Sequence, residues 1–262
     1  MIKLTYVPSV SPNGPKLFII PGGPGLSSLT LRGLDVLKRS FELIYVDIQG
    51  TNDSSYTGKK TFTEITTALE KVVKSESGLK YALGHSFGGF VAAELLVRDV
   101  VSGLVCISTP FSKAALSSAN DNYLKNMSPA LSDAELKWTE MRDDSSFANW
   151  VSEYGDMYFL TPKGKDALIN DRVSAKYFLD NRADVLGKED LLDVLRTIEQ
   201  KKIFIAGSAD KLLDVDILKN DSLAGGFEFF EVENASHFVT MDQPDKVSNL
   251  IETEFLYHKG EK

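Results

Sequence analysis

Short apolar runs alternate with longer amphipathic segments along most of this 262-residue chain. Several of the short runs are hydrophobic at consecutive positions, as strands are when helices cover both faces of a sheet. The alternation of such runs with helical patterns favours βαβ units. The sequence therefore predicts an α/β fold with a mostly parallel central sheet and helices on both faces. The predicted strands are 16–20, 41–46, 79–83, 103–107, 202–206 and 227–232.

Three segments, two between these strands and one after the last strand, carry helix signals. Thr61 and Glu64 form a capping-box pattern that predicts a helix running to about Lys74. Residues 87–98 are apolar nearly all round, which indicates a buried central helix. A last helix is expected after Pro244, because four apolar residues there fall on one stripe. They are Val247, Leu250, Ile251 and Phe255.

The alternation stops between about residues 111 and 200, where no strand is predicted. Ser132 and Glu135 form a second capping-box pattern, and apolar residues follow at helical spacing: Phe147, Trp150, Val151 and Tyr154. We expect a helical insertion over 111–189. Residues 1–110 and 190–262 would then be the two parts of one core, with 190–198 returning to the sheet as a packing helix.

Composition narrows the classes of function. The formal net charge is −8 with a sequence pI near 5.0, which disfavours binding to nucleic acid. No apolar run reaches the roughly 18 residues that span a bilayer, and the N-terminus lacks the apolar segment of a signal peptide. We expect a cytoplasmic protein without a membrane partner. Cys106 is the single cysteine, so an intrachain disulfide is impossible and a small buried thiol is expected.

The sharpest motif is the stretch Gly84-His85-Ser86-Phe87-Gly88, which fits G-x-S-x-G between a predicted strand and a predicted helix. In that context the turn exposes the Ser86 hydroxyl on a strained backbone. Strand and helix approach closely there, so a Cβ at position 84 or 88 would clash. The helix N-terminus also directs backbone N–H groups at developing negative charge. Ser86 is therefore the candidate nucleophile, the alternative being a bystander serine in a glycine-rich turn.

A serine hydroxyl needs a base, and the chain has only three histidines. His85 adjoins the nucleophile and is expected to point away from it. His258 lies in the charged C-terminal stretch, where fraying is common. His237 directly follows the last predicted strand, where open α/β sheets place functional groups. Elimination and position make His237 the candidate base.

The base needs a carboxylate to fix its tautomer and stabilise the imidazolium. Asp210 stands directly after the predicted strand 202–206, and Asp214 and Asp216 follow a few residues later. Asp210 is preferred because the turn that ends a strand holds a carboxylate most rigidly. Its alternatives are a solvated loop residue or a helix N-cap.

An oxyanion formed during acyl transfer needs two preorganised N–H donors. One is expected from Phe87, the residue after the nucleophile, and the other from the loop after the first predicted strand. That loop is Pro21-Gly22-Gly23-Pro24-Gly25. Pro24 has no N–H, so Gly22, Gly23 and Gly25 are the possible donors, and Gly23 is preferred.

Together these residues resemble the α/β-hydrolase superfamily, over nearly the whole chain. The turn 207–210 is similar to the acid turn of that family, and Ser236-His237-Phe238 is similar to its histidine loop. The order Ser, Asp, His is also that of the family. The resemblance implies an α/β-hydrolase fold in which the insertion 111–189 is a cap over the active site.

Within the superfamily, the loop Gly22-Gly23-Pro24-Gly25 and the stretch 47–54 resemble those of proline iminopeptidases. The chain departs from their pattern at four positions. Pro21 stands in place of a histidine, Gln49 of an arginine, Asn52 of a glycine and Phe87 of a tryptophan. With Phe87 the elbow is similar to that of many esterases and carbon–carbon bond hydrolases. The resemblance thus implies the mechanism more firmly than the substrate.

These observations predict a serine hydrolase that acts through an acyl-enzyme on a small molecule or a short peptide. Proline-iminopeptidase-like cleavage comes first, and carboxylester, thioester or carbon–carbon bond hydrolysis is the alternative. A hydrolase-fold ligand sensor is a hypothesis of another class. No metal-ligand cluster or phosphate-binding loop is found, so neither metal nor organic cofactor is expected; the oligomeric state stays open.

Two sets of cap residues bear on the substrate. Aromatic residues of the cap could line an apolar pocket; they are Trp138, Phe147, Trp150, Tyr154, Tyr158 and Phe159. Acidic residues of the cap could bind a substrate ammonium; they are Glu140, Asp143, Asp144, Glu153 and Asp156.

Overall fold

The fold is taken from a computed structural model that describes residues 2–183 and 188–257. Its centre is a seven-stranded sheet with the strand order β1-β3-β2-β4-β5-β6-β7. β1 runs antiparallel to β3, and the other neighbouring pairs are parallel. The strands are β1 (Ile2–Val7), β2 (Lys16–Ile20), β3 (Glu42–Ile48), β4 (Lys80–His85), β5 (Gly103–Ile107), β6 (Lys201–Gly207) and β7 (Glu228–Val232). This confirms the predicted α/β fold and all six predicted strands.

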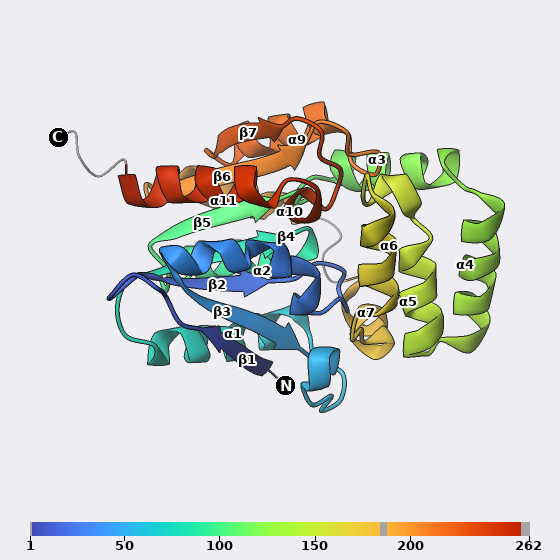
Figure 1. Ribbon diagram of the computed structural model, residues 1–262, viewed down its shortest axis with the longest axis horizontal. Coiled ribbons are helices and arrows are strands. Elements are labelled where there is room, and N and C mark those ends of the chain that lie inside the picture. The colour runs from blue at the N-terminus through green and yellow to red at the C-terminus, as the bar shows by residue number, and fades with distance from the viewer. Residues whose placement is uncertain (1, 184–187, 258–262) are drawn as a thin grey trace.

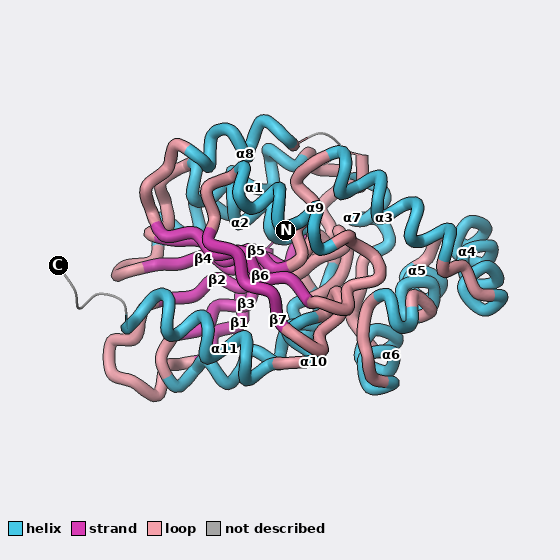
Figure 2. Tube along the Cα trace, turned by 90° about the horizontal axis from the view of Figure 1, so that it is seen from above, coloured by secondary structure: helices cyan, strands magenta, loops and turns pink. Residues whose placement is uncertain are grey.

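Two hydrophobic cores lie on the two faces of the sheet, because successive strand side chains point to opposite faces. In β2, Phe18 and Ile20 pack into one core, while Leu17 and Ile19 pack into the other. Figure 2 shows α1, α2 and α8 on one side of the sheet and α11 on the other. The helices of this core are η1 (Ser28–Arg39), η2 (Thr51–Asp53), α1 (Phe62–Ser75), α2 (Phe87–Val97), α8 (Glu189–Arg196), α9 (Val215–Ala224), α10 (Val239–Asp242), α11 (Pro244–Glu252) and η4 (Thr253–Tyr257).

Local sequence signals explain most of these elements. Thr61 and Glu64 form the predicted capping box at the start of α1. α2 is buried nearly all round, as its composition predicts, and Cys106 is a buried free thiol. The η1 segment was not predicted as a helix. Its buried leucines recur every third residue, which suits three residues per turn; they are Leu31, Leu34 and Leu37.

The interval between β5 and β6 is helical, as predicted, and projects beyond one end of the sheet (Figure 1). The boundaries 111–189 of the cap stay a prediction. The capping box expected at Ser132 is wrong: α4 begins earlier, at Pro129, and Ser128 caps it by accepting from the Leu131 N–H. Ser132 therefore lies inside a helix. The helices of the interval before α8 are α3 (Lys113–Lys125), α4 (Pro129–Met141), α5 (Asp144–Ser152), η3 (Gly155–Met157), α6 (Pro162–Ile169) and α7 (Ala175–Asn181).

A third hydrophobic core joins the cap to the sheet domain. It contains Trp138, Phe147 and Phe159 from the cap, together with Leu26 and Phe238 from loops at the edge of the sheet. None of the helices within 2–183 and 188–257 is long and apolar enough to cross a membrane.

Candidate active site

Ser86 occupies a sharp turn between β4 and α2. Its φ of 50° and ψ of −120° lie outside the regions that L-residues ordinarily adopt, at a cost of about 1–3 kcal/mol. A Cβ at Gly84 would come within 2.2 Å of the Gly88 carbonyl oxygen, and one at Gly88 within 2.3 Å of the Ile20 carbonyl oxygen. The predicted steric need for glycine at both positions is confirmed.

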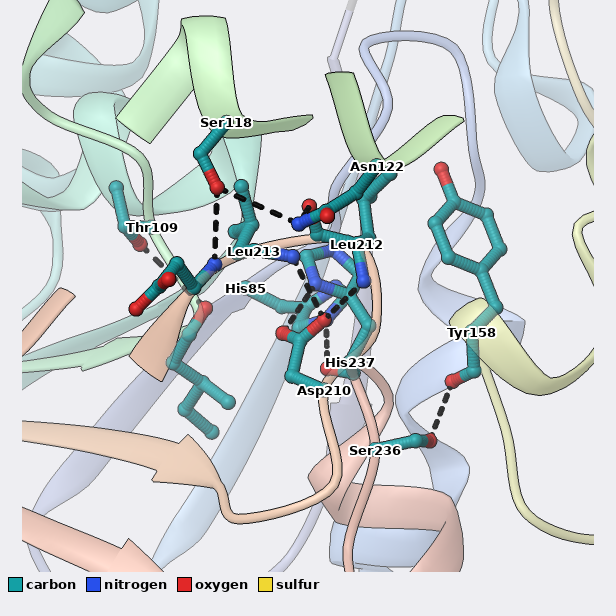
Figure 3. Close-up of polar contacts among 12 residues, drawn as sticks. His85, Thr109, Ser118, Asn122, Tyr158, Asp210, Leu212, Leu213, Ser236 and His237 are labelled. Atoms are coloured by element: carbon teal, nitrogen blue, oxygen red, sulfur yellow. Dashed lines mark hydrogen bonds and ion pairs between the residues drawn. The ribbon is translucent and has the colours of Figure 1, made fainter. Parts of the chain in front are cut away.

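Asp210 and His237 meet at the carboxyl ends of the neighbouring strands β6 and β7. His237 Nδ1 lies 3.0 Å from Asp210 Oδ2, and the two side chains are 2% and 0% exposed. Asp210 Oδ1 accepts from the N–H groups of Leu212, at 2.9 Å, and Leu213, at 3.0 Å (Figure 3). Asp210 is therefore fixed on both oxygens and orients the imidazole, as expected of the acid.

The rival carboxylates have other roles in the fold. Asp214 is the N-cap of α9 and accepts from the N–H groups of Asp216 and Ile217. Asp216 lies in the first turn of that helix. The loop between Asp210 and Asp214 is also held by α3 of the cap. Asn122 Nδ2 donates to the Leu212 carbonyl at 3.1 Å (Figure 3). The Asp214 N–H donates to Ser118 Oγ at 3.2 Å.

His85 supports the histidine loop, a role that the sequence analysis missed. Its Nε2 lies 3.0 Å from the His237 carbonyl oxygen, so Nε2 carries the proton and donates. Its ring also contacts the rings of His237 and Phe238, at centroid distances of 5.0 and 4.5 Å. Burial, followed by the nearby His237, lowers the pKa of His85 to about 3, so this side chain stays neutral. His258, set aside as the base, lies outside the described residues.

The structure records no hydrogen bond between Ser86 Oγ and His237, although both residues are described. The two are linked through their neighbours, since His85 precedes Ser86 and contacts the His237 ring. Catalytic hydrogen bonds commonly tighten only when substrate is bound. The half-buried Ser86 hydroxyl makes no other recorded hydrogen bond within 2–183 and 188–257.

The glycine-rich loop after β2 lies directly beside the elbow. A Cβ at Gly22 would come within 3.1 Å of Ser86 Cβ and 2.9 Å of His85 Nδ1, so only glycine lets this backbone approach. Gly23 follows with a φ of 112°. Phe87 is the first residue of α2, and its N–H has no acceptor within the helix. The predicted donors Gly23 and Phe87 thus stand on the two segments that meet at Ser86.

Two buried carboxylates anchor the end of this loop. Asp171, from the cap, accepts from the N–H and hydroxyl of Ser27. Asp47, at the end of β3, accepts from the N–H of Ser28 at 2.7 Å and from its hydroxyl at 2.9 Å. The cap therefore helps to hold the candidate oxyanion loop in place.

Asp171 makes stability depend on pH. Burial raises its pKa to about 6, although hydrogen bonds from Ser27 lower it, and the ordinary value is 3.8. The folded state thus binds this proton more tightly than the unfolded state. The Asp171 contribution is most favourable below the unfolded pKa and is lost as pH rises through about 6. In the wild type, this loss should lower the free energy of unfolding by about 2 kcal/mol between about pH 4.5 and pH 7.5. In Asp171→Asn, that decrease should be absent. Urea unfolding of both proteins at the two pH values tests this, and equal pH dependence would contradict it.

The aromatic residues of the cap divide into two groups. Trp138, Phe147 and Phe159 are buried in the third core and serve as packing. A second group, the tyrosine series Tyr123, Tyr154 and Tyr158, leads to the candidate base His237. The ring centroids are 5.2 Å apart between Tyr123 and Tyr154 and 4.3 Å apart between Tyr154 and Tyr158. Tyr158 in turn stacks on His237, with centroids 5.2 Å apart. Helical spacing within the insertion gave no sign of this contact.

The acidic residues considered for binding an ammonium mostly have partners within the cap or the core. Asp143 caps α5, and Asp144 Oδ1 accepts from the Ala175 N–H at 2.7 Å. Glu153 pairs with Lys165, and Asp156 pairs with Lys211. Glu140 is exposed on the cap surface. Glu135, considered above only as part of a capping-box pattern, influences Tyr123. Burial and then Glu135 raise the pKa of Tyr123 to about 12, against a hydrogen bond from Trp150.

No group of three or more His, Cys, Asp or Glu side chains suited to a metal ion occurs in the part of the chain that the structure describes. The arrangement combines a hydroxyl on a strained turn, a buried carboxylate–imidazole pair and a glycine-rich loop beside that turn. Those parts suit nucleophilic attack on a carbonyl followed by stabilisation of an oxyanion.

Comparisons with known proteins agree with this architecture. Comparison with curated protein sequences gave no match. A thermophilic esterase from Thermogutta terrifontis superposes with a TM-score of 0.74 at 16% identity, over 96% of this chain and 91% of that one. For an esterase from Exiguobacterium antarcticum the TM-score is 0.72 at 16% identity, over 96% and 94%. For a proline iminopeptidase from Mycobacterium smegmatis it is 0.67 at 16% identity, over 98% and 94%.

These structural likenesses, at such low identity, concern the fold alone. The sequence itself matches the model of the alpha/beta hydrolase family over residues 17–250. That match spans the elbow, the acid turn and the histidine loop. Because the family model matches most of the chain, the chain belongs to the alpha/beta hydrolase family.

Proposed function

We propose that this protein is a serine hydrolase that cleaves small acyl substrates, esters or thioesters, through an acyl-enzyme. The observation that carries the proposal is the buried Asp210–His237 pair, 3.0 Å apart, beside the strained Ser86 turn. A carboxylate fixed by two main-chain N–H groups holds the imidazole in the tautomer whose free Nε2 can accept a proton.

The cycle uses the chain's own residues. His237 takes the Ser86 proton as Oγ attacks the acyl carbonyl carbon. The N–H groups of Gly23 and Phe87 hold the oxyanion, and His237 protonates the leaving group. A water molecule, activated by His237, then attacks the acyl-enzyme and releases the acid.

The surroundings of the base favour an ester or thioester over an amine substrate. Four of the five acidic cap residues considered for an ammonium already bind other groups, and the fifth is exposed. The side chains between the cap and the base are aromatic rings. A neutral ester can approach these rings without the desolvation cost that a charged amine lacking a carboxylate partner would meet.

Aminopeptidase action on an N-terminal proline is the second candidate. The loop 22–25 favours it, because its sequence resembles that of proline iminopeptidases.

A panel of short and medium acyl p-nitrophenyl esters beside prolyl and alanyl arylamides separates the candidates. We expect the esters to turn over repeatedly and the arylamides to be poor substrates. Preference for the prolyl arylamide would favour the aminopeptidase instead. A single covalent event without further turnover would favour a ligand sensor.

A further inference from the structure

Tyr158 brings the cap into direct contact with the candidate base. Its ring stacks on the His237 imidazole with centroids 5.2 Å apart and an angle of 16° between the planes. The same ring stacks on Tyr154 at 4.3 Å and 23°. Tyr158 therefore has aromatic partners both in the cap and in the histidine loop.

The main-chain carbonyl of Tyr158 also binds the histidine loop, residues 236–238. The Tyr158 carbonyl accepts from Ser236 Oγ at 2.6 Å (Figure 3). It also accepts from the Phe238 N–H at 2.9 Å, so its two donors flank His237. Asp242 links the same two segments a second time. Its carboxylate accepts from the Ser236 N–H of the histidine loop at 2.8 Å and from the Leu160 N–H of the cap at 3.1 Å. The cap segment next to η3 and the histidine loop are thus held together on both sides of the base.

A histidine held by one hydrogen bond can still tilt about the line from Nδ1 to the carboxylate oxygen. Asp210 supplies that single bond, at 3.0 Å. A ring packed flat against the imidazole opposes the tilt, which would carry Nε2 away from the Ser86 hydroxyl. A misplacement of about 1 Å in such a site can cost roughly 100-fold in rate.

We propose that Tyr158 is a positioning residue for His237, so that the cap carries part of the catalytic support and is not only a cover. The inference rests on the proposed function, because it assumes that His237 is the base. The aromatic face also favours the imidazolium that forms when His237 takes the proton. Both effects act after substrate has bound, so they concern kcat more than KM.

The test compares Tyr158→Leu, Tyr158→Phe and Tyr123→Leu on the best ester of the panel. We expect Tyr158→Leu to lower kcat roughly 10- to 100-fold with KM nearly unchanged, and to slow labelling by a fluorophosphonate probe. Tyr158→Phe keeps the stacked ring and should restore kcat. Tyr123→Leu removes a ring of the same series that does not contact His237, and should leave kcat close to wild type.

Wild-type kcat in Tyr158→Leu, or an equal loss in Tyr123→Leu, would overturn the inference. Thermal unfolding confirms that each variant is folded, and Tyr158→Met replaces the leucine variant if that one is not. Failure of the proposed function is a separate outcome: wild-type protein would then show no Ser86-dependent hydrolysis or labelling. In that case the role assigned to Tyr158 falls with it.

Discussion

Replacing Ser86 with alanine is expected to abolish covalent labelling by a fluorophosphonate probe and to lower kcat by on the order of 10⁶. The probe reacts only with a serine hydroxyl that a base activates, and Ser86 is the hydroxyl at the elbow beside the carboxylate–imidazole pair. Alanine keeps the Cβ and so fits the same strained backbone. The loss should therefore appear in a protein that still unfolds cooperatively.

Ser108→Ala is the matched control for that experiment. Ser108 also follows a buried strand and has a positive φ of 47°. Its buried hydroxyl makes no hydrogen bond to any residue that the structure describes. It lacks the helix N-terminus and the approach of the oxyanion loop that distinguish Ser86. The control should label like wild type. Labelling retained in Ser86→Ala would refute the nucleophile assignment.

Much of the fold follows from local sequence because the signals there are redundant. The strand β5, Gly103–Ile107, is apolar throughout and has the predicted limits. α1 begins at its capping box, and α2 begins where the glycine spacing requires a turn. β1 was not predicted, although Ile2, Leu4 and Tyr6 alternate with Lys3 and Thr5. It is a half-buried edge strand, so its pattern is weaker than that of the buried strands.

The candidate site could be predicted where each residue is tied to the end of a strand. Ser86, Asp210 and His237 follow β4, β6 and β7, and parallel strands bring their carboxyl ends to one edge of the sheet. The remaining supports depend on contacts between segments far apart in the chain. Tyr158 contacts a residue 79 positions away, and Asp171 contacts Ser27, 144 positions away. Neither partner leaves a periodic signal.

His85 shows a third limit of sequence reasoning. Its position beside the nucleophile was clear, and it was set aside only as a base. Tertiary packing gives His85 a different role, because its Nε2–H donates to the main-chain carbonyl of His237 and holds it in place. A neutral, fully buried imidazole suits that task, since it donates one hydrogen bond without carrying charge into the core.

His237→Ala is expected to lower kcat by on the order of 10⁶ on a good ester, by analogy with other triads whose members act as a unit. His85 offers no substitute base, because burial lowers its pKa to about 3 and makes it a poor proton acceptor. Its Nε2–H is also donated to the His237 carbonyl. Among the residues that the structure describes, the change also leaves the buried Asp210 carboxylate with only the N–H groups of Leu212 and Leu213 as partners. We therefore expect a lower free energy of unfolding as well as lost turnover.

Steady-state kinetics measures the turnover, and denaturant unfolding measures the free energy of unfolding. A loss of turnover smaller than about tenfold in His237→Ala would mean that the base is elsewhere. Partial recovery of turnover in His237→Ala on adding free imidazole would separate the lost proton acceptor from lost stability. An imidazole in solution can take the proton from Ser86 but cannot repair the folded state. Unfolding without loss of turnover would instead make the Asp210–His237 pair a structural feature of the loop.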